Sequence, residues 1–446
     1  MGLYARRGEI VAPPRSSGGG MTRPNILYIH SHDTGRYVQP YGYAVATPHI
    51  QRLADEGVLF RRAFCAAPTC SPSRAALLTG QSPHSAGMLG LAHRGWALRD
   101  YGQHLLHTLR REAGYFSALF GIQHLARQTD DAARNGAIIG YDLTVAPSDD
   151  TAAKAAWWLH AAARERQPFF LDVGFFESHR IGQQEGGFNP GGQGGDARHV
   201  APLPSLPDAP EVRGDVADYA VAVARLDAKI GQVLDALDAS GLADTTLVVC
   251  TTDHGPPFPA MKCNLTDAGM GVMLLMRGPG GFTGGRVVEA MVSQLDVFPT
   301  LCDLLAIPHP AWLQGASLLP LVHGERTAVH DAVFAEVSFH AAYEPQRAVR
   351  TARWKYIRRF APPPLPGTNC DAGPSKKLWL RHGWTDRLYA PEQLYDLVFD
   401  PHEGRNQIGD PDARVVLDDL RERLTRWMHA TDDPLLHGPI PAPPGT

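Results

Sequence analysis

The chain has 446 residues, of which 44% are hydrophobic and 20% charged, a balance typical of globular proteins that bury a sizeable core. This length predicts two or three domains, or one large α/β domain with an appendage. The formal net charge of −4 provides no basic field for nucleic acid, and no apolar run approaches the roughly 20 residues that span a membrane. Binding to nucleic acid and insertion into a membrane are therefore not expected.

The N-terminus and the cysteines bear on location and redox state. Residues 1–22 lack the apolar core of a signal peptide, so we predict a flexible tail and a cytoplasmic location. Six cysteines are sparse for this length and show no zinc-finger spacing. Cys250 and Cys302 lie in apolar stretches and are expected to be reduced core residues, so disulfides are not expected to hold the fold.

Strands and helices alternate through the first 305 residues. Apolar runs typical of buried strands, most of them followed by polar residues, occur at 24–30, 115–120, 169–175, 247–250 and 272–276. Helical spacing of apolar residues predicts helices that begin at Pro48 and at 102–113, 152–166, 215–239 and 294–305. This alternation predicts an α/β fold, with a large, mostly parallel sheet sandwiched by helices.

Two segments depart from the alternation. Residues 180–214 are rich in Gly and Pro and too long for a plain connector, so a loop over the site or a partly disordered segment is expected. After about residue 330, strands are predicted at 333–337, 350–359 and 393–397, before a final helix at 413–429. We therefore expect an α/β domain over residues 23–329 and a smaller C-terminal α+β subdomain with a small antiparallel sheet over 330–446.

A helix start at residues 70–80 combines a cysteine with a fixed cation. Ser71 can cap this helix, Pro72 suits its first turn, and Gly80 stops it. Cys70 falls at the N-terminus, where free amides favour a thiolate or another anion, and Arg74 follows on the same face. The stretch therefore indicates an anion site, although a lone cysteine in this position is more often a small buried hydrophobe.

Several predicted strands end in residue types that bind metals or transfer protons. These are His32 and Asp33, His124, His179, and Asp253 with His254. Any one of them has an ordinary structural explanation, as a helix cap or a hydrogen-bonded histidine. Because the carboxyl ends of parallel strands meet at one edge of a sheet, all of them are expected to converge and to suggest a divalent metal beside an acid–base pair.

The string Cys70-Ser-Pro-Ser-Arg74, followed by Leu78-Thr-Gly80, resembles the signature of the sulfatases, which have an alkaline phosphatase-like fold. In that family a formylglycine-generating enzyme oxidises the cysteine to formylglycine. The resemblance implies that one hydroxyl of the hydrated aldehyde attacks sulfur and that the other later expels sulfate. Residues 25–35 and Asp253-His254-Gly255 look like two further sulfatase motifs. Strings such as residues 176–180, 256–259 and 394–403 resemble the branch that cleaves N-sulfo groups.

The resemblance also implies roles for matching residues. Asp33, Asp253 and His254 would bind the metal together with the oxygens of modified Cys70, and Arg74 would hold the oxygens of the nucleophile. Proton transfer and charge neutralisation would fall to three more residues: His124 at the hydrate, His179 at the leaving group, and Lys262 at the sulfate oxygens.

Two positions depart from the family pattern. His32 stands where an aspartate is usual, and Ile122 stands where a lysine is common. Calcium is the metal that the resemblance implies; if His32 and His254 both bind, manganese or a similar metal becomes plausible. Ile122 removes a cation from the anion pocket, so sulfate should bind more weakly unless Gln123 or a loop residue compensates.

The sequence thus predicts a hydrolase of sulfate esters or N-sulfo groups, acting on a sulfated sugar or a similar small anionic substrate. One alternative is a phosphonate or phosphate ester hydrolase with the same nucleophile. A second is a non-catalytic member in which Cys70 stays unmodified and the site binds a metal or an anionic sugar.

Overall fold

The computed structural model describes residues 23–127, 131–181, 186–188, 194–362, 364–387 and 389–443. The predicted tail at 1–22 and part of the predicted loop at 180–214 lie outside these residues.

An eight-stranded sheet forms the centre of the molecule, in the order β10-β2-β9-β8-β1-β5-β3-β4. Its strands are β1 (Asn25–Ser31), β2 (Val58–Phe64), β3 (Phe116–Gly121), β4 (Leu143–Val145), β5 (Phe169–Gly174), β8 (Thr246–Thr252), β9 (Leu274–Arg277) and β10 (Arg286–Ser293). The neighbouring strands β8, β1, β5, β3 and β4 are mutually parallel, whereas β9 runs antiparallel to both of its neighbours. The predicted fold class, α/β with a mostly parallel sheet, is confirmed.

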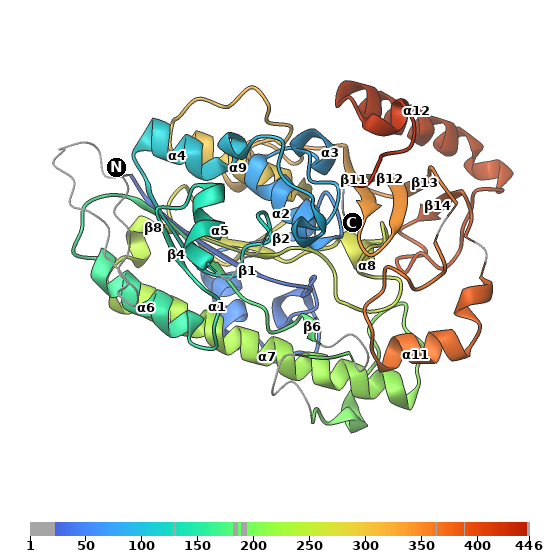
Figure 1. The fold of residues 1–446 in the computed structure, drawn as a ribbon, viewed down its shortest axis with the longest axis horizontal. Coiled ribbons are helices and arrows are strands. Elements are labelled where there is room, and N and C mark those ends of the chain that lie inside the picture. The colour runs from blue at the N-terminus through green and yellow to red at the C-terminus, as the bar shows by residue number, and fades with distance from the viewer. Residues whose placement is uncertain are drawn as a thin grey trace.

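Helices cover both faces of this sheet (Figure 1). One face carries α2 (Cys70–Thr79), α4 (Leu105–Ala113) and α9 (Val297–Leu304), and the other carries α1 (Pro48–Glu56), α6 (Thr151–Ala162) and α7 (Pro210–Ala239). Each layer has its own hydrophobic core, with Leu109 and Leu301 in the first and Trp158 and Leu226 in the second. Because both faces are covered, β5 and β8 are buried along their whole length.

Shorter elements connect these layers. The helices are α3 (Pro83–Ala86), α5 (Ala132–Ile139), α8 (Asp267–Met270) and α10 (Leu319–Val322). A two-stranded sheet of β6 (Arg180–Ile181) and β7 (Gly187–Phe188) lies within the predicted loop at 180–214.

A second, antiparallel sheet follows after residue 330 (Figure 1). It contains β11 (Ala332–Phe339), β12 (Tyr343–Thr351), β13 (Trp354–Arg359) and β14 (Glu392–Asp396), and α11 (Pro374–Arg381) and α12 (Arg414–Ala430) accompany it. Leu417, Leu420 and Leu424 of α12 share a core with Val349 and Leu394 of the sheet. The domain boundary at residue 330 stays a prediction.

Three features of the fold differ from the sequence-based expectations. Strands β2 and β10 were not predicted, because charged residues interrupt both of them. Residues 350–359, predicted as one strand, are the end of β12, a turn, and β13; the hydroxyl of Thr351 accepts a hydrogen bond from the Trp354 amide across that turn. The helix predicted at 102–113 begins only at Leu105, because the His104 side chain caps its first turn.

Candidate active site

Four neighbouring parallel strands deliver the polar residues to one edge of the sheet. β1 ends directly before His32 and Asp33, and β8 ends directly before Asp253 and His254. His124 and His179 follow β3 and β5, which pair in the same parallel set. The predicted convergence is therefore present in the structure.

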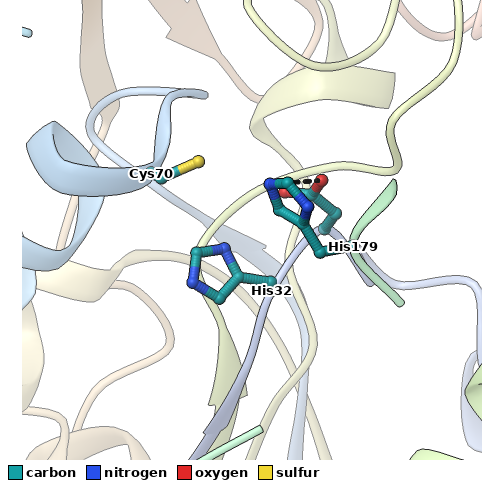
Figure 2. A group of neighbouring side chains, drawn as sticks. His32, Cys70 and His179 are labelled. Atoms are coloured by element: carbon teal, nitrogen blue, oxygen red, sulfur yellow. Dashed lines mark ion pairs between the residues drawn. The ribbon is translucent and has the colours of Figure 1, made fainter. Parts of the chain in front are cut away.

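Cys70 is the first residue of α2 and is 2% exposed. Figure 2 shows its sulfur facing the same space as the rings of His32 and His179. Burial raises the pKa of the Cys70 thiol well above its ordinary value, so an unmodified Cys70 would be a neutral thiol despite its place at a helix start. The expected cap is wrong: Thr69 holds the N-cap position, and the Ser71 hydroxyl accepts a hydrogen bond from the Ala92 amide at 3.0 Å.

Four donor groups from three elements surround one point. Single ligand atoms of Asp33, Cys70, Asp253 and His254 all lie within 4.8 Å of one another. His254 Nε2 is 3.3 Å from Asp33 Oδ1 and 3.4 Å from Cys70 Sγ. The Nδ1–H of His254 is donated to the Gly255 carbonyl at 2.9 Å, which leaves the Nε2 lone pair directed at the carboxylates. This is the arrangement of a metal-binding histidine.

Unpartnered buried atoms indicate that this group is incomplete without a ligand. Among the described residues, Asp33 Oδ1 and both ring nitrogens of His32 are buried without a hydrogen bond. His32 Nδ1 also lies 3.1 Å from Asp253 Oδ2, outside hydrogen-bonding geometry. Asp33 has a φ of 53°, a strained conformation for a residue with a side chain, and its amide donates to Asp253 Oδ1 at 2.8 Å. The residues therefore fit a divalent metal ion.

Arg74 is fixed by a chain of buried hydrogen bonds. Its Nη1 donates to His30 Nδ1 at 2.5 Å, and its Nη2 contacts the Ser31 carbonyl and Asp253 Oδ2 at 3.0 and 3.1 Å. Since Nδ1 accepts, His30 Nε2–H donates to Asp172 Oδ1 at 2.8 Å, and the Tyr141 hydroxyl donates to Asp172 Oδ2 at 2.5 Å. Arg74 Nε is left buried without a partner and is available to an anion.

The remaining histidines border the same space. His124 Nε2 is 3.2 Å from Nδ1 of exposed His93, and the two rings stack, while His124 Nδ1 is buried without a partner. His179 packs on Phe176 and donates Nδ1–H to the Arg180 carbonyl, so that its Nε2 faces Asp33 Oδ2 at 3.9 Å (Figure 2). Burial lowers the pKa of His32, His124 and His179.

Lys262 lies between two carboxylates. Its Nζ is 2.9 Å from Asp33 Oδ2 and 2.9 Å from Asp371 Oδ2. Burial alone would lower the pKa of Lys262, but the two carboxylates raise it well above its ordinary value, so the ammonium is retained. Ile122 is buried, and the Gln123 amide hydrogen-bonds Leu125 and Ala126 within its own loop, so Gln123 does not replace the missing cation.

Sequence reasoning missed several residues of this site: His30, His93, Tyr141, Asp172 and Asp371. Asp172 carried a readable signal, because it is a charge inside an otherwise apolar strand. The others depend on contacts between distant segments, which spacing along the chain does not reveal.

Comparison with known proteins decides the family. A sequence model described as Sulfatase matches residues 24–307, more than half of the chain. The chain belongs to the sulfatase family. A further model, described as N-sulphoglucosamine sulphohydrolase, C-terminal, matches residues 262–363. The sulfatase is 31% identical to human N-sulphoglucosamine sulphohydrolase, over 93% of this chain and 92% of the relative.

Solved structures support the fold. One protein in complex with its substrate D-glucosamine-2-N,6-O-disulfate aligns with a TM-score of 0.65 and 18% identity, over 92% of this chain and 98% of that one. The phosphonate monoester hydrolase of Agrobacterium radiobacter aligns with a TM-score of 0.63 and 22% identity, over 92% and 96%. At these identities the likeness concerns the fold alone.

Membership confirms the predicted enzyme class, a hydrolase of sulfate esters or N-sulfo groups. The family generally uses formylglycine and a metal ion, and this sulfatase has residue groups that could hold a metal. None of the helices within the described ranges is both long and apolar enough for a membrane span. The cytoplasmic location stays a prediction.

Proposed function

We propose that this sulfatase removes the N-sulfo group of a glucosamine-like amino sugar. The C-terminal match to N-sulphoglucosamine sulphohydrolase and the 31% identity to the human enzyme of that name support this substrate class. The alignment covers 92% of the human enzyme and 93% of this chain, so the similarity includes both the site and the segments around it.

The nucleophile would come from Cys70. The observation that carries this proposal is the position of its sulfur, 3.4 Å from His254 Nε2 and within the group formed with Asp33 and Asp253. Oxidised to formylglycine by a maturation enzyme, Cys70 would supply a hydroxyl at this position.

Asp33, Asp253 and His254 would hold the divalent ion, with His32 beside them. The ion would supply positive charge that stabilises the sulfuryl oxygens and the nucleophile's oxygen. Because imidazole nitrogens join the carboxylates here, we propose manganese or a similar borderline metal in preference to calcium, which takes oxygen ligands.

The other side chains would handle charge and protons. Arg74, held by His30 and Asp253, would present its free Nε–H to the anion, and Lys262 would contribute a second cation. His124 Nδ1 would accept a proton from the nucleophile, because this nitrogen is buried in the site and unpartnered. His179 Nε2 would carry a proton to the leaving nitrogen.

The test measures sulfate and free amine released from N-sulfoglucosamine. The wild-type enzyme, co-expressed with a formylglycine-generating enzyme, should release both in equal amounts, and Cys70→Ala should release neither while keeping the wild-type melting temperature. Mass spectrometry of the tryptic peptide that spans residues 63–74 should show the lighter aldehyde at position 70. Intact cysteine in an active preparation would refute the nucleophile, and faster turnover of phenyl phosphonate esters than of any sulfated substrate would refute the substrate class.

A further inference from the structure

Asp371 is a carboxylate of the site that the proposed mechanism does not use. It lies in the segment between β13 and α11, and it contacts Lys262 Nζ, as Asp33 does. The side chain of Asp33 is fully buried, whereas that of Asp371 is 21% exposed. Asp371 is therefore the more accessible of the two carboxylates on Lys262, although its Oδ2 is buried and, among the described residues, has no hydrogen-bond partner.

The backbone on both sides of Asp371 is firmly anchored. Two residues before it, buried Asn369 accepts hydrogen bonds from the Ala341 and Ala342 amides at 2.9 and 2.8 Å. Four residues after it, the amide and hydroxyl of buried Ser375 both donate to Asp215 Oδ2.

Asp215 in turn forms a two-pronged ion pair with Arg180, whose nitrogens lie 2.8 Å from its oxygens. Arg180 directly follows His179, so the segment that carries Asp371 and the loop that carries His179 are tied to one buried carboxylate. Such anchoring is unusual for an exposed loop and fixes the Asp371 carboxylate relative to His179.

The two possible reactions of a sulfatase leave different charges at this place. Hydrolysis of R–NH–SO₃⁻ by one water breaks the S–N bond, forms an S–O bond and transfers both water protons to nitrogen, which gives R–NH₃⁺ and sulfate. Hydrolysis of R–O–SO₃⁻ gives a neutral alcohol instead. Only the first reaction develops a positive charge on the leaving atom, which a nearby carboxylate stabilises.

We infer that Asp371 is a specificity-determining residue that contacts the leaving nitrogen and favours N-sulfo over O-sulfo substrates. The inference rests on the proposed function and deepens it, because it names the residue that distinguishes the two linkages. Its geometric basis is the carboxylate's contact with Lys262, its buried Oδ2 without a hydrogen-bond partner, and the anchoring of its segment to the loop of His179 through Asp215. Lys262 contacts both Asp33 and Asp371. Its positive charge would stabilise the sulfuryl oxygens, while the negative charge of Asp371 would stabilise the leaving ammonium group.

The experiment compares Asp371→Asn with wild type on N-sulfoglucosamine and on an aryl sulfate. Charge-assisted contacts of this kind contribute enough that kcat/KM for N-sulfoglucosamine should fall about tenfold to a hundredfold. Turnover of the aryl sulfate should stay within about twofold, since no cation forms on its oxygen. Asp386→Asn, which removes an exposed carboxylate from the stretch that follows α11, is the matched control and should behave as wild type.

A second readout uses the product. Glucosamine should inhibit wild type more strongly than N-acetylglucosamine, which carries no charge, and Asp371→Asn should abolish that difference. If Asp371→Asn slows both substrates equally, Asp371 serves only to hold Lys262, and the inference is wrong while the proposed function stands. If wild type does not cleave N-sulfoglucosamine at all, the proposed function fails and the inference falls with it.

Discussion

Replacing Asp172 with Asn tests whether the buried hydrogen bonds that link Arg74 to His30 and Asp172 contribute to catalysis. Asp172 accepts hydrogen bonds from His30 Nε2 at 2.8 Å and from the Tyr141 hydroxyl at 2.5 Å. Asn has the same shape but no charge, and its NH₂ group cannot accept the hydrogen bond that one carboxylate oxygen now accepts. Either His30 or Tyr141 therefore loses an acceptor, and the ring that orients Arg74 Nη1 is no longer held by a negative charge.

The magnitude follows from these two bonds. Hydrogen bonds to a charged group contribute about 1.5–3 kcal/mol each, and the amide retains part of one of them, so we expect the variant to be destabilised by about 2 kcal/mol. If half of this loss appears as misorientation of Arg74 in the transition state, kcat/KM falls about fivefold to tenfold. Tyr141→Phe removes one hydrogen bond but leaves the charged Asp172 carboxylate bonded to His30. Its kcat/KM should therefore change less than about twofold.

The assay combines kinetics with inhibition by inorganic sulfate. Arg74 and the sulfate oxygens attract each other, so Asp172→Asn should weaken sulfate inhibition and lower kcat/KM by similar factors, whereas a purely structural defect lowers only the melting temperature. The reasoning would be refuted by an Asp172→Asn enzyme that is less stable yet retains wild-type kcat/KM and wild-type sulfate inhibition.

Two further predictions concern the metal and pH. After the metal is removed by chelation, Mn²⁺ should raise the melting temperature more than equimolar Ca²⁺. When the metal-free protein is given a mixture of both ions, elemental analysis should recover Mn²⁺. An equal or larger effect of Ca²⁺ would contradict a metal site with nitrogen ligands. Burial lowers the pKa of His330, but its hydrogen bonds to Asp296 at 2.8 and 2.9 Å outweigh this effect, so that the pKa is raised above 6.5. Because the folded state then binds the proton more tightly, this stabilisation is complete below pH 6.5 and is lost as pH rises through the folded-state pKa. The melting temperature of wild type should therefore exceed that of His330→Gln by a margin that shrinks above neutral pH, and a margin independent of pH would show that His330 titrates normally.

The sequence allowed these four strands and their functional ends to be predicted, because β1, β3, β5 and β8 are mostly apolar runs followed by polar residues. Strands β2 and β10, at one margin of the sheet, were harder to predict. Their charged residues lie toward solvent and interrupt the apolar runs. The antiparallel direction of β9 depends on chain reversal in space and leaves no mark in its composition.

At the site, the residues on strand ends could be predicted and their partners could not. Asp172 and His30 are 142 positions apart, and their contact arises only because β5 pairs with β1. Asp371 contacts Lys262 although the two residues are far apart in the sequence, and no local pattern indicates this contact. Local chemistry thus identified the ligands and the nucleophile, whereas the groups that orient them follow from tertiary structure.

The charges of the side chains at the site favour binding of a divalent cation. The titratable groups that face the site, within the described residues, include three carboxylates and two cations: Asp33, Asp253, Asp371, Arg74 and Lys262. Burial lowers the pKa of His32, His124 and His179, which disfavours a positive charge on these rings. The five carboxylates and cations alone carry one net negative charge. A lysine at position 122 would have cancelled this charge, but Ile122 does not. A divalent ion reverses the sign, so binding of a sulfated substrate, and not only its turnover, should depend on the metal.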